Sequence, residues 1–183
     1  MIPKKKGVAS SFEMMEKDNP IASSGNIPNL YRKIRLVRNF SLLIIVLLFA
    51  QFLLGMWTNL FVAFPQSSSL NPLDLVFTNG PYILLVHIVN GLGLGILAVC
   101  VVVLSVIVKT RLLILLTSLG MLSILAAGES GILFVVGFYS DNSLSFSMAF
   151  GFISALMMYF FTLMYCGSRL SSNEISLKKA NLV

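Results

Sequence analysis

The sequence predicts an all-α, polytopic membrane protein in which four transmembrane helices pack as an antiparallel bundle. Hydrophobic residues make up 57% of the 183-residue chain and charged residues only 11%, whereas a soluble domain carries about 25% charged residues. Four apolar stretches each have about the length of a helix that crosses a ~30 Å hydrocarbon core. The basic residues lie beside these stretches and not within them, as is typical of membrane topology.

This composition excludes several classes of protein. So few charged groups cannot cover a water-exposed surface, so we expect neither a soluble cytosolic enzyme nor a disordered protein. A net charge of +6 raises the question of a nucleic-acid partner. Basic residues that flank apolar segments are better explained by membrane topology. We therefore expect no nucleic-acid partner and a lipid bilayer as the surroundings of the chain.

The amino-terminal region is polar and basic. Residues 1–30 contain three consecutive lysines, three prolines and a Ser-Ser-Gly stretch, and they show no apolar periodicity. We expect a disordered cytosolic tail here. Residues 31–39 begin with YRKIRLVR, which alternates basic and apolar side chains and predicts an interfacial basic segment at the lipid headgroups.

Residues 40–166 are predicted to form the four-helix transmembrane domain, followed by a cytosolic tail at 167–183. The expected spans are residues 40–64, 81–108, 112–139 and 144–166. A polar loop at 65–80 joins the first two spans and ends in Asn79-Gly80-Pro81, a turn with proline at a helix start. Lys109-Thr110-Arg111 and Ser140-Asp141-Asn142-Ser143 predict two tight hairpins, and the second hairpin can cap the fourth helix.

The distribution of charge predicts the orientation in a cell membrane. All thirteen basic residues fall in the amino-terminal region, the 109–111 hairpin or the carboxyl-terminal tail. The two other loops contain no basic residue and one acid each, Asp74 and Asp141. Because positively charged loops stay on the cytosolic side, we expect a multi-pass protein with both termini in the cytosol.

Ionisable and polar groups inside the apolar spans are the natural candidates for function, because each is costly in hydrocarbon. Counting 1.5 Å per residue from the predicted outer helix ends places several of them in one layer of the outer half. The members of this predicted outer layer are Met56, Asn59, His87, Asn90 and Glu129. Gln51 comes out deeper, past the middle of its helix. Asn59, Asn90 and Glu129 are predicted to form a polar intramembrane cluster with His87.

The simplest interpretation of this layer is tight helix packing. His87 and Gly91 belong to a stripe of small residues on the second span, and Gly120 and Gly151 belong to similar stripes on the third and fourth. Small residues four apart let neighbouring helices approach closely. In this interpretation an interhelical hydrogen bond joins His87 to Glu129.

A second interpretation makes His87 an axial ligand of haem b. Membrane four-helix bundles hold haem between helices through histidine, and glycines leave room for the ring. Met56 lies at similar depth and is a possible second ligand. Since the chain contains only one histidine, ligation by two histidines would need a partner subunit.

A third interpretation centres on Glu129 as a proton-binding carboxylate in a small transporter or channel. Four helices would have to dimerise to enclose a path. A lipid-modifying enzyme is the weakest candidate, because the spacing shows no nucleophile set and no carboxylate pair. We therefore expect no catalytic residues. Two cysteines without neighbouring ligands also predict no metal site.

The segment GMWTNLFVAFP at residues 55–65, then His87 with Gly91, then Glu129-Ser130-Gly131 on a small-residue third span form a recognisable combination. It resembles an uncharacterised group of small prokaryotic four-helix integral membrane proteins, over roughly residues 51–159. The architecture is also loosely similar to the four-helix half-units of haem A synthase and to small subunits of respiratory complexes. The chain departs from haem A synthase in lacking its paired histidines. The resemblance implies this fold in a prokaryotic cell membrane.

Together these features predict a non-catalytic membrane subunit of a larger assembly, such as a respiratory or electron-transfer complex, or of a homo-oligomer. Its outer layer would bind haem or hold helices and partners together. The alternative is a small proton-coupled transporter or channel that works through a buried Glu129.

Overall fold

The computed structural model describes residues 27–61, 82–137 and 141–180, with side chains placed over 29–61, 82–137 and 141–172. This part of the chain is all-helical, and its four helices are each long and apolar enough to span a membrane. The helices are α2 (Ile27–Phe61), α4 (Tyr82–Val108), α5 (Arg111–Val136) and α6 (Asn142–Ala180). The predicted tail over residues 1–26, the loop at 65–80 and residues 181–183 lie outside the described residues.

The first and last helices are longer than the apolar stretches that predict them. The helix α2 begins at Ile27, so the basic segment at 31–39 forms early turns of the same helix. The helix α6 continues over residues 167–180, where the sequence predicts a tail. The extension of α2 contains several Arg, Lys and Leu residues, which have high helix propensity, whereas the extension of α6 also contains a glycine and four serines. The ends of the helices therefore differ from the ends of the apolar stretches: α2 and α6 extend past them, whereas α5 ends at Val136, inside its predicted span of 112–139.

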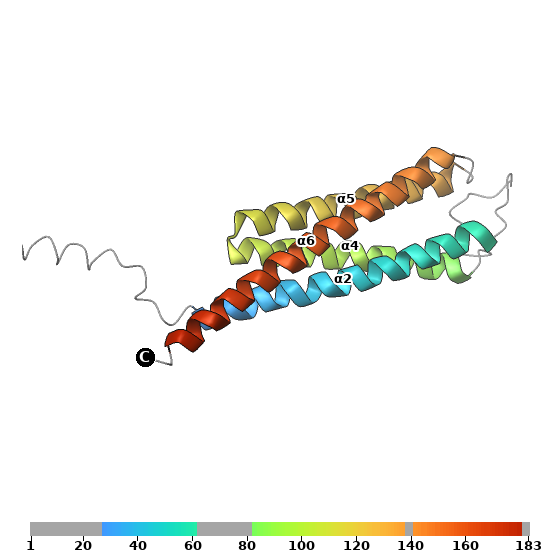
Figure 1. Ribbon diagram of the computed structural model, residues 1–183. Helices are drawn as coiled ribbons and strands as arrows, with labels where there is room; N and C mark the ends of the chain where they lie inside the picture. The colour runs from blue at the N-terminus through green and yellow to red at the C-terminus, as the bar shows by residue number, and fades with distance from the viewer. Residues whose placement is uncertain (1–26, 62–81, 138–140, 181–183) are drawn as a thin grey trace, which may run out of the picture.

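The helices pack in a ring in which each contacts two others. The helix α2 packs on α4, α4 on α5, α5 on α6, and α6 returns to α2. Figure 1 shows that α2 and α6 run past the turn between α4 and α5, toward the end where the chain terminates. At this turn Lys109 adopts a φ of 59°, and its backbone N–H donates to the Val106 carbonyl at 3.0 Å.

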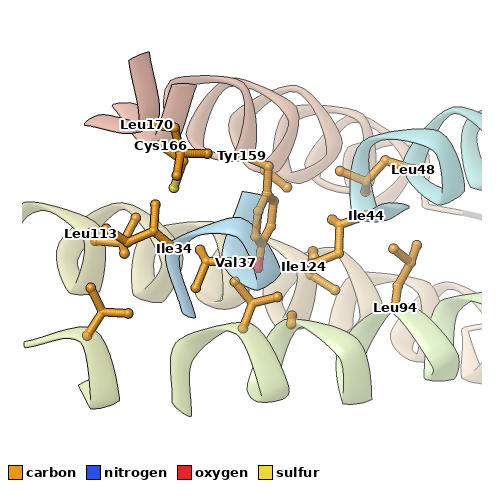
Figure 2. Packing of buried hydrophobic residues seen from close by; sticks show 14 residues of the cluster. Ile34, Val37, Ile44, Leu48, Leu94, Leu113, Ile124, Tyr159, Cys166 and Leu170 are labelled. Atoms are coloured by element: carbon orange, nitrogen blue, oxygen red, sulfur yellow. The ribbon is translucent and has the colours of Figure 1, made fainter. Parts of the chain in front are cut away.

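The hydrophobic core runs along the centre of this ring and draws residues from all four helices. Tyr159 of α6 is its largest fully buried side chain. Figure 2 shows the Tyr159 ring directed from α6 into the space between the other helices, near Val37 and Ile124. Ile44 and Leu94 are also almost completely buried. Contacts of this kind fix which helix faces point inward.

The closest helix contacts occur at glycines of α5 and α6. A Cβ atom on Gly120 would lie 2.8 Å from Cε2 of Tyr159, so the glycine makes room for the tyrosine ring. A Cβ on Gly151 would lie 2.9 Å from the Ser123 carbonyl oxygen and 2.9 Å from the Ala127 Cβ. The small residues that the sequence marks on these two helices therefore lie at their interface, as expected for close helix approach.

Many hydroxyl groups on the helices are satisfied locally, although the buried hydroxyls of Ser41 and Tyr159 have no hydrogen-bond partner among the described residues. Several donate to the backbone carbonyl four residues earlier: Thr58, Ser105, Thr117, Ser123, Ser130 and Thr162. The Ser130 and Ser147 Oγ atoms also lie 2.9 Å apart and link α5 to α6. Local bonding of this kind suits a medium without water, where each polar group needs a partner within the protein.

The outside of the ring is apolar over the middle of every helix. Leu53, Ile96, Ile132 and Phe146 are each more than 60% exposed. Soluble monomers rarely expose contiguous apolar patches beyond a few hundred Å². Large apolar side chains exposed on all four helices are therefore compatible with a surface that faces lipid.

Candidate functional site

The main polar contact inside the ring joins α2 to α4 and consists of Gln51, His87 and Asn90, which we call the α2–α4 polar cluster. The Gln51 side-chain nitrogen and the His87 Nε2 lie 3.2 Å apart. The Asn90 Nδ2 donates to Gln51 Oε1 at 2.7 Å and to the Leu47 backbone carbonyl at 3.3 Å. The cluster thus forms a chain of hydrogen bonds that crosses from one helix to the other.

Two glycines let this cluster form, one on each helix. A Cβ on Gly55 of α2 would lie 3.1 Å from Cε1 of His87. A Cβ on Gly91 of α4 would lie 3.1 Å from the side-chain nitrogen of Gln51. Each polar side chain therefore occupies the space over a glycine of the opposite helix. Because Gln51 precedes Gly55 by four residues and His87 precedes Gly91 by four, the arrangement is reciprocal.

The Leu47 carbonyl determines the direction of every hydrogen bond in the cluster. A carbonyl oxygen only accepts, so the Asn90 atom that faces it is the amide nitrogen. The same nitrogen faces Gln51, so Gln51 presents its oxygen to Asn90 and its nitrogen to His87. His87 Nε2 is then the acceptor, and the ring proton of the neutral imidazole resides on Nδ1.

The second ring nitrogen of His87 has a different environment. His87 Nδ1 is buried and has no hydrogen-bond partner among the described residues. An unmet buried donor costs about 1–3 kcal/mol. The His87 ring is therefore held from one side by Gln51 and by its contact with Gly55, and its Nδ1–H has no partner among the described residues.

The structure brings only two members of the predicted outer layer into this contact. His87 and Asn90 join Gln51, which the depth count places too deep to meet them. Met56 and Asn59 are exposed on α2. Met56 follows Gly55 directly and is therefore turned about 100° around the helix from the residue that faces His87.

Glu129 also lies apart from the α2–α4 polar cluster. It is exposed on α5, and no hydrogen bond or ion pair joins it to His87 within the described part of the chain. Its neighbours Leu125 and Ile132 are exposed apolar residues. The position differs from the predicted buried carboxylate, because the α5 face that packs on α6 carries Gly120, Ala127 and Ser130 instead.

The geometry of the cluster suits helix packing better than haem ligation. A ligating Nε2 must be free to face the iron, whereas His87 Nε2 accepts from Gln51. The His87 ring also lies against the α2 backbone at Gly55, where a porphyrin would have to enter. Met56 is 41% exposed and does not complete a ligand pair there. Within the described residues, no group of three His, Cys, Asp or Glu side chains lies close enough to hold a metal ion.

Gln51 is the functional residue that depth counting misses. The counting assumes that α2 and α4 end at the same level. From the observed ends, Gln51 lies about 15 Å from Phe61 and His87 about 7 Å from Tyr82. The two helices are therefore staggered, and α2 extends beyond the start of α4 (Figure 1). One sequence pattern could have predicted the contact between Gln51 and His87: on each helix, a polar residue stands four positions before a glycine.

Searches against protein families, characterised proteins and solved structures find no match for this chain. The properties of the site are therefore inferred from the contacts and distances of its own residues.

Proposed function

We propose that this chain is a non-catalytic, multi-pass subunit of a larger membrane assembly. Its four helices cross a prokaryotic cell membrane as an antiparallel bundle with both termini in the cytosol. The side chains of Gln51, His87 and Asn90 hold α2 against α4. A partner subunit, or a second copy of the chain, covers the exposed face of α5 around Glu129.

The exposed position of Glu129 is the observation that carries this proposal. Glu129 lies seven residues from the end of α5 at Val136, which is about 10 Å along the helix. An acidic side chain costs about 3 kcal/mol at the centre of a spanning helix and less toward the ends, so a lipid-facing Glu129 at this depth is unfavourable by up to about that amount. The described residues supply no hydrogen-bond partner for Glu129. A donor from another polypeptide chain would supply one for its carboxyl group.

The α2–α4 polar cluster supports a holding role because each of its three hydrogen bonds joins α2 to α4. Interhelical hydrogen bonds in membranes contribute about 0.6 kcal/mol on average and up to about 1.7 kcal/mol. A cluster of this strength stabilises a helix pair without making it rigid. Haem binding through His87 stays a prediction, and the geometry favours it less, because Gln51 occupies His87 Nε2.

The alternative function, proton-coupled transport through Glu129, also stays a prediction. An exposed carboxylate encloses no path by itself, so this function needs the same covering partner. The two functions differ in their test. A transporter loses pH-dependent flux in the Glu129→Gln variant, whereas a subunit held by a hydrogen bond keeps its assembly in that variant.

The proposal is tested by the mass of the particle extracted from native membranes into polymer nanodiscs. We expect a particle much larger than one 20.1 kDa chain in its lipid disc. The Glu129→Leu variant should release the chain from the assembly, and the Glu129→Gln variant should retain it because glutamine still forms hydrogen bonds. Leu125→Ala, on the same exposed face, is the matched control. A wild-type chain that is extracted alone would refute the proposal.

A further inference from the structure

A cavity of about 200 Å³ lies at the end of the ring where α4 turns into α5. Its walls come from all four helices and from the turn, and they include Ile34, Val108, Thr110, Leu113, Cys166 and Arg169. At this end α2 and α6 run past the shorter α4–α5 hairpin (Figure 1), so residues of both helices line the cavity together with the turn.

The wall of the cavity is about half apolar and half polar, and it is cationic at one point. Ile34, Leu113 and Cys166 are buried, whereas Arg169 is exposed. The Arg169 Nε donates to the Tyr165 hydroxyl at 3.0 Å, and the guanidinium carbon lies 5.5 Å from the centroid of the Tyr165 ring. Only one of the five guanidinium N–H donors is used in this bond, so Arg169 is held in place with donors left for a ligand.

The charge around the cavity favours an anion. The basic residues with described side chains gather at this end of the molecule: Arg32, Lys33, Arg35, Arg38, Lys109, Arg111 and Arg169. The two acidic residues with described side chains are Glu129, near the end of α5, and Asp141, at the start of α6. Both lie toward the end of the helix ring that is opposite the α4–α5 turn. A surface of this kind attracts acidic phospholipids of the cytosolic leaflet.

We propose that this cavity binds the headgroup region of one acidic phospholipid. The phosphate is held by Arg169, and the glycerol carbons lie against Ile34 and Leu113. The volume equals that of roughly seven waters at about 30 Å³ each, which suits a phosphate with part of its glycerol. The acyl chains remain in the bilayer. A soluble anion would leave the apolar wall unused, so the amphipathic ligand matches the cavity better. This site is independent of the face of α5 that carries Glu129.

The test is native mass spectrometry of the purified full chain in neutral detergent, titrated with phosphatidylglycerol or phosphatidylcholine. We expect one phosphatidylglycerol to bind with about tenfold preference over phosphatidylcholine, which corresponds to about 1.4 kcal/mol. Arg169→Gln should abolish this preference. Thr110→Phe should abolish it by filling the cavity, and this substitution loses no hydrogen bond because Thr110 makes no side-chain cap contact.

Arg32→Gln is the matched control, since it removes the same charge at the same end but does not line the cavity. It should retain the preference. An equal loss in Arg32→Gln and Arg169→Gln would overturn the proposal in favour of diffuse surface charge. Full displacement of phosphatidylglycerol by inorganic phosphate would also overturn it, because the ligand would then be free phosphate. A circular dichroism spectrum that matches the wild type shows that each variant is folded.

Discussion

The side-chain nitrogen of Gln51 lies 3.2 Å from His87 Nε2, and each residue rests over a glycine of the opposite helix. Gln51 covers Gly91, and His87 covers Gly55. The contact between α2 and α4 therefore depends on two matched requirements, a polar side chain and an empty position facing it. Because both helices meet these two requirements, the contact fixes which faces meet and how far the two helices are offset along their axes.

Breaking the hydrogen bonds of this cluster should weaken the contact between α2 and α4. Gln51→Leu removes the group that donates to His87 and the oxygen that accepts from Asn90. We expect the free energy of unfolding to fall by about 1 kcal/mol. The double variant with His87→Leu should lose less than the sum of the single variants, because they share one contact. The free energy of unfolding in sodium dodecyl sulfate titrations measures this. Met56→Leu, exposed on the same helix, should change it by less than about 0.5 kcal/mol.

The glycine facing Gln51 should tolerate no large side chain. Gly91→Leu places atoms where the Gln51 amide lies, so we expect a loss of about 1–3 kcal/mol from overpacking. Gly93 is the control on the same helix, because a Cβ added there meets nothing within 4 Å. Gly93→Leu should leave the unfolding transition nearly unchanged. Equal effects at the two positions would contradict the described helix contact.

The contact between α5 and α6 should be still less tolerant at Gly151. A Cβ there meets the Ser123 backbone oxygen at 2.9 Å, and a helix backbone cannot move aside as a flexible side chain can. We expect Gly151→Ala to cost about 1–3 kcal/mol in the same titration. Gly167→Ala on the same helix meets nothing within 4 Å. It should be neutral or stabilising by about 0.5–1 kcal/mol, because alanine favours helix more than glycine.

The start of α6 should show a pH dependence that comes from Asp141. The Ser143 backbone N–H and the Ser143 hydroxyl donate to Asp141 Oδ1 at 2.8 and 2.6 Å, as expected of a helix N-cap. These bonds hold the pKa of Asp141 below its ordinary value of 3.8. A lowered pKa in the folded state means that the stabilisation is fully present above pH 3.8 and is lost as the pH falls through the lower folded value.

Thermal unfolding in a nonionic detergent between pH 2 and pH 6 measures this effect. The wild-type chain should lose more stability on acidification than Asp141→Asn, because asparagine still caps the helix but does not titrate. Groups other than Asp141 titrate in both proteins and cancel in the difference. Identical pH profiles for the two proteins would contradict the capping role.

The sequence predicts where the helices lie along the chain but not which side of each helix points inward. Apolar length alone predicts four helices that are long and apolar enough to span a membrane, because few other structures satisfy such long apolar stretches. A helix that is apolar on all sides gives no signal for its inward face, so Met56 and Glu129 were predicted inside and lie exposed. The glycines were more informative. Gly91, Gly120 and Gly151 all lie where a neighbouring side chain or backbone approaches closely.

The predicted partner of His87 differed for a related reason. Depth counting compares residues on helices whose ends are assumed level, and the stagger of α2 against α4 is a tertiary property. Stagger is set by which side chains fit over which glycines. The sequence contains that information only as the matched spacing of Gln51 with Gly55 and His87 with Gly91, which becomes informative once the two helices are known to be neighbours.

The visible absorption spectrum of the purified chain tests the central claim most directly, namely the proposed role of His87 in holding helices together, against the alternative that His87 ligates haem. The protein should be extracted in mild detergent from cells with ample haem and measured oxidised and after dithionite reduction, beside His87→Ala. We expect a colourless wild-type protein whose His87→Ala variant differs only in stability. A Soret band with reduced α and β bands that disappear in His87→Ala would contradict the account and make His87 a haem ligand.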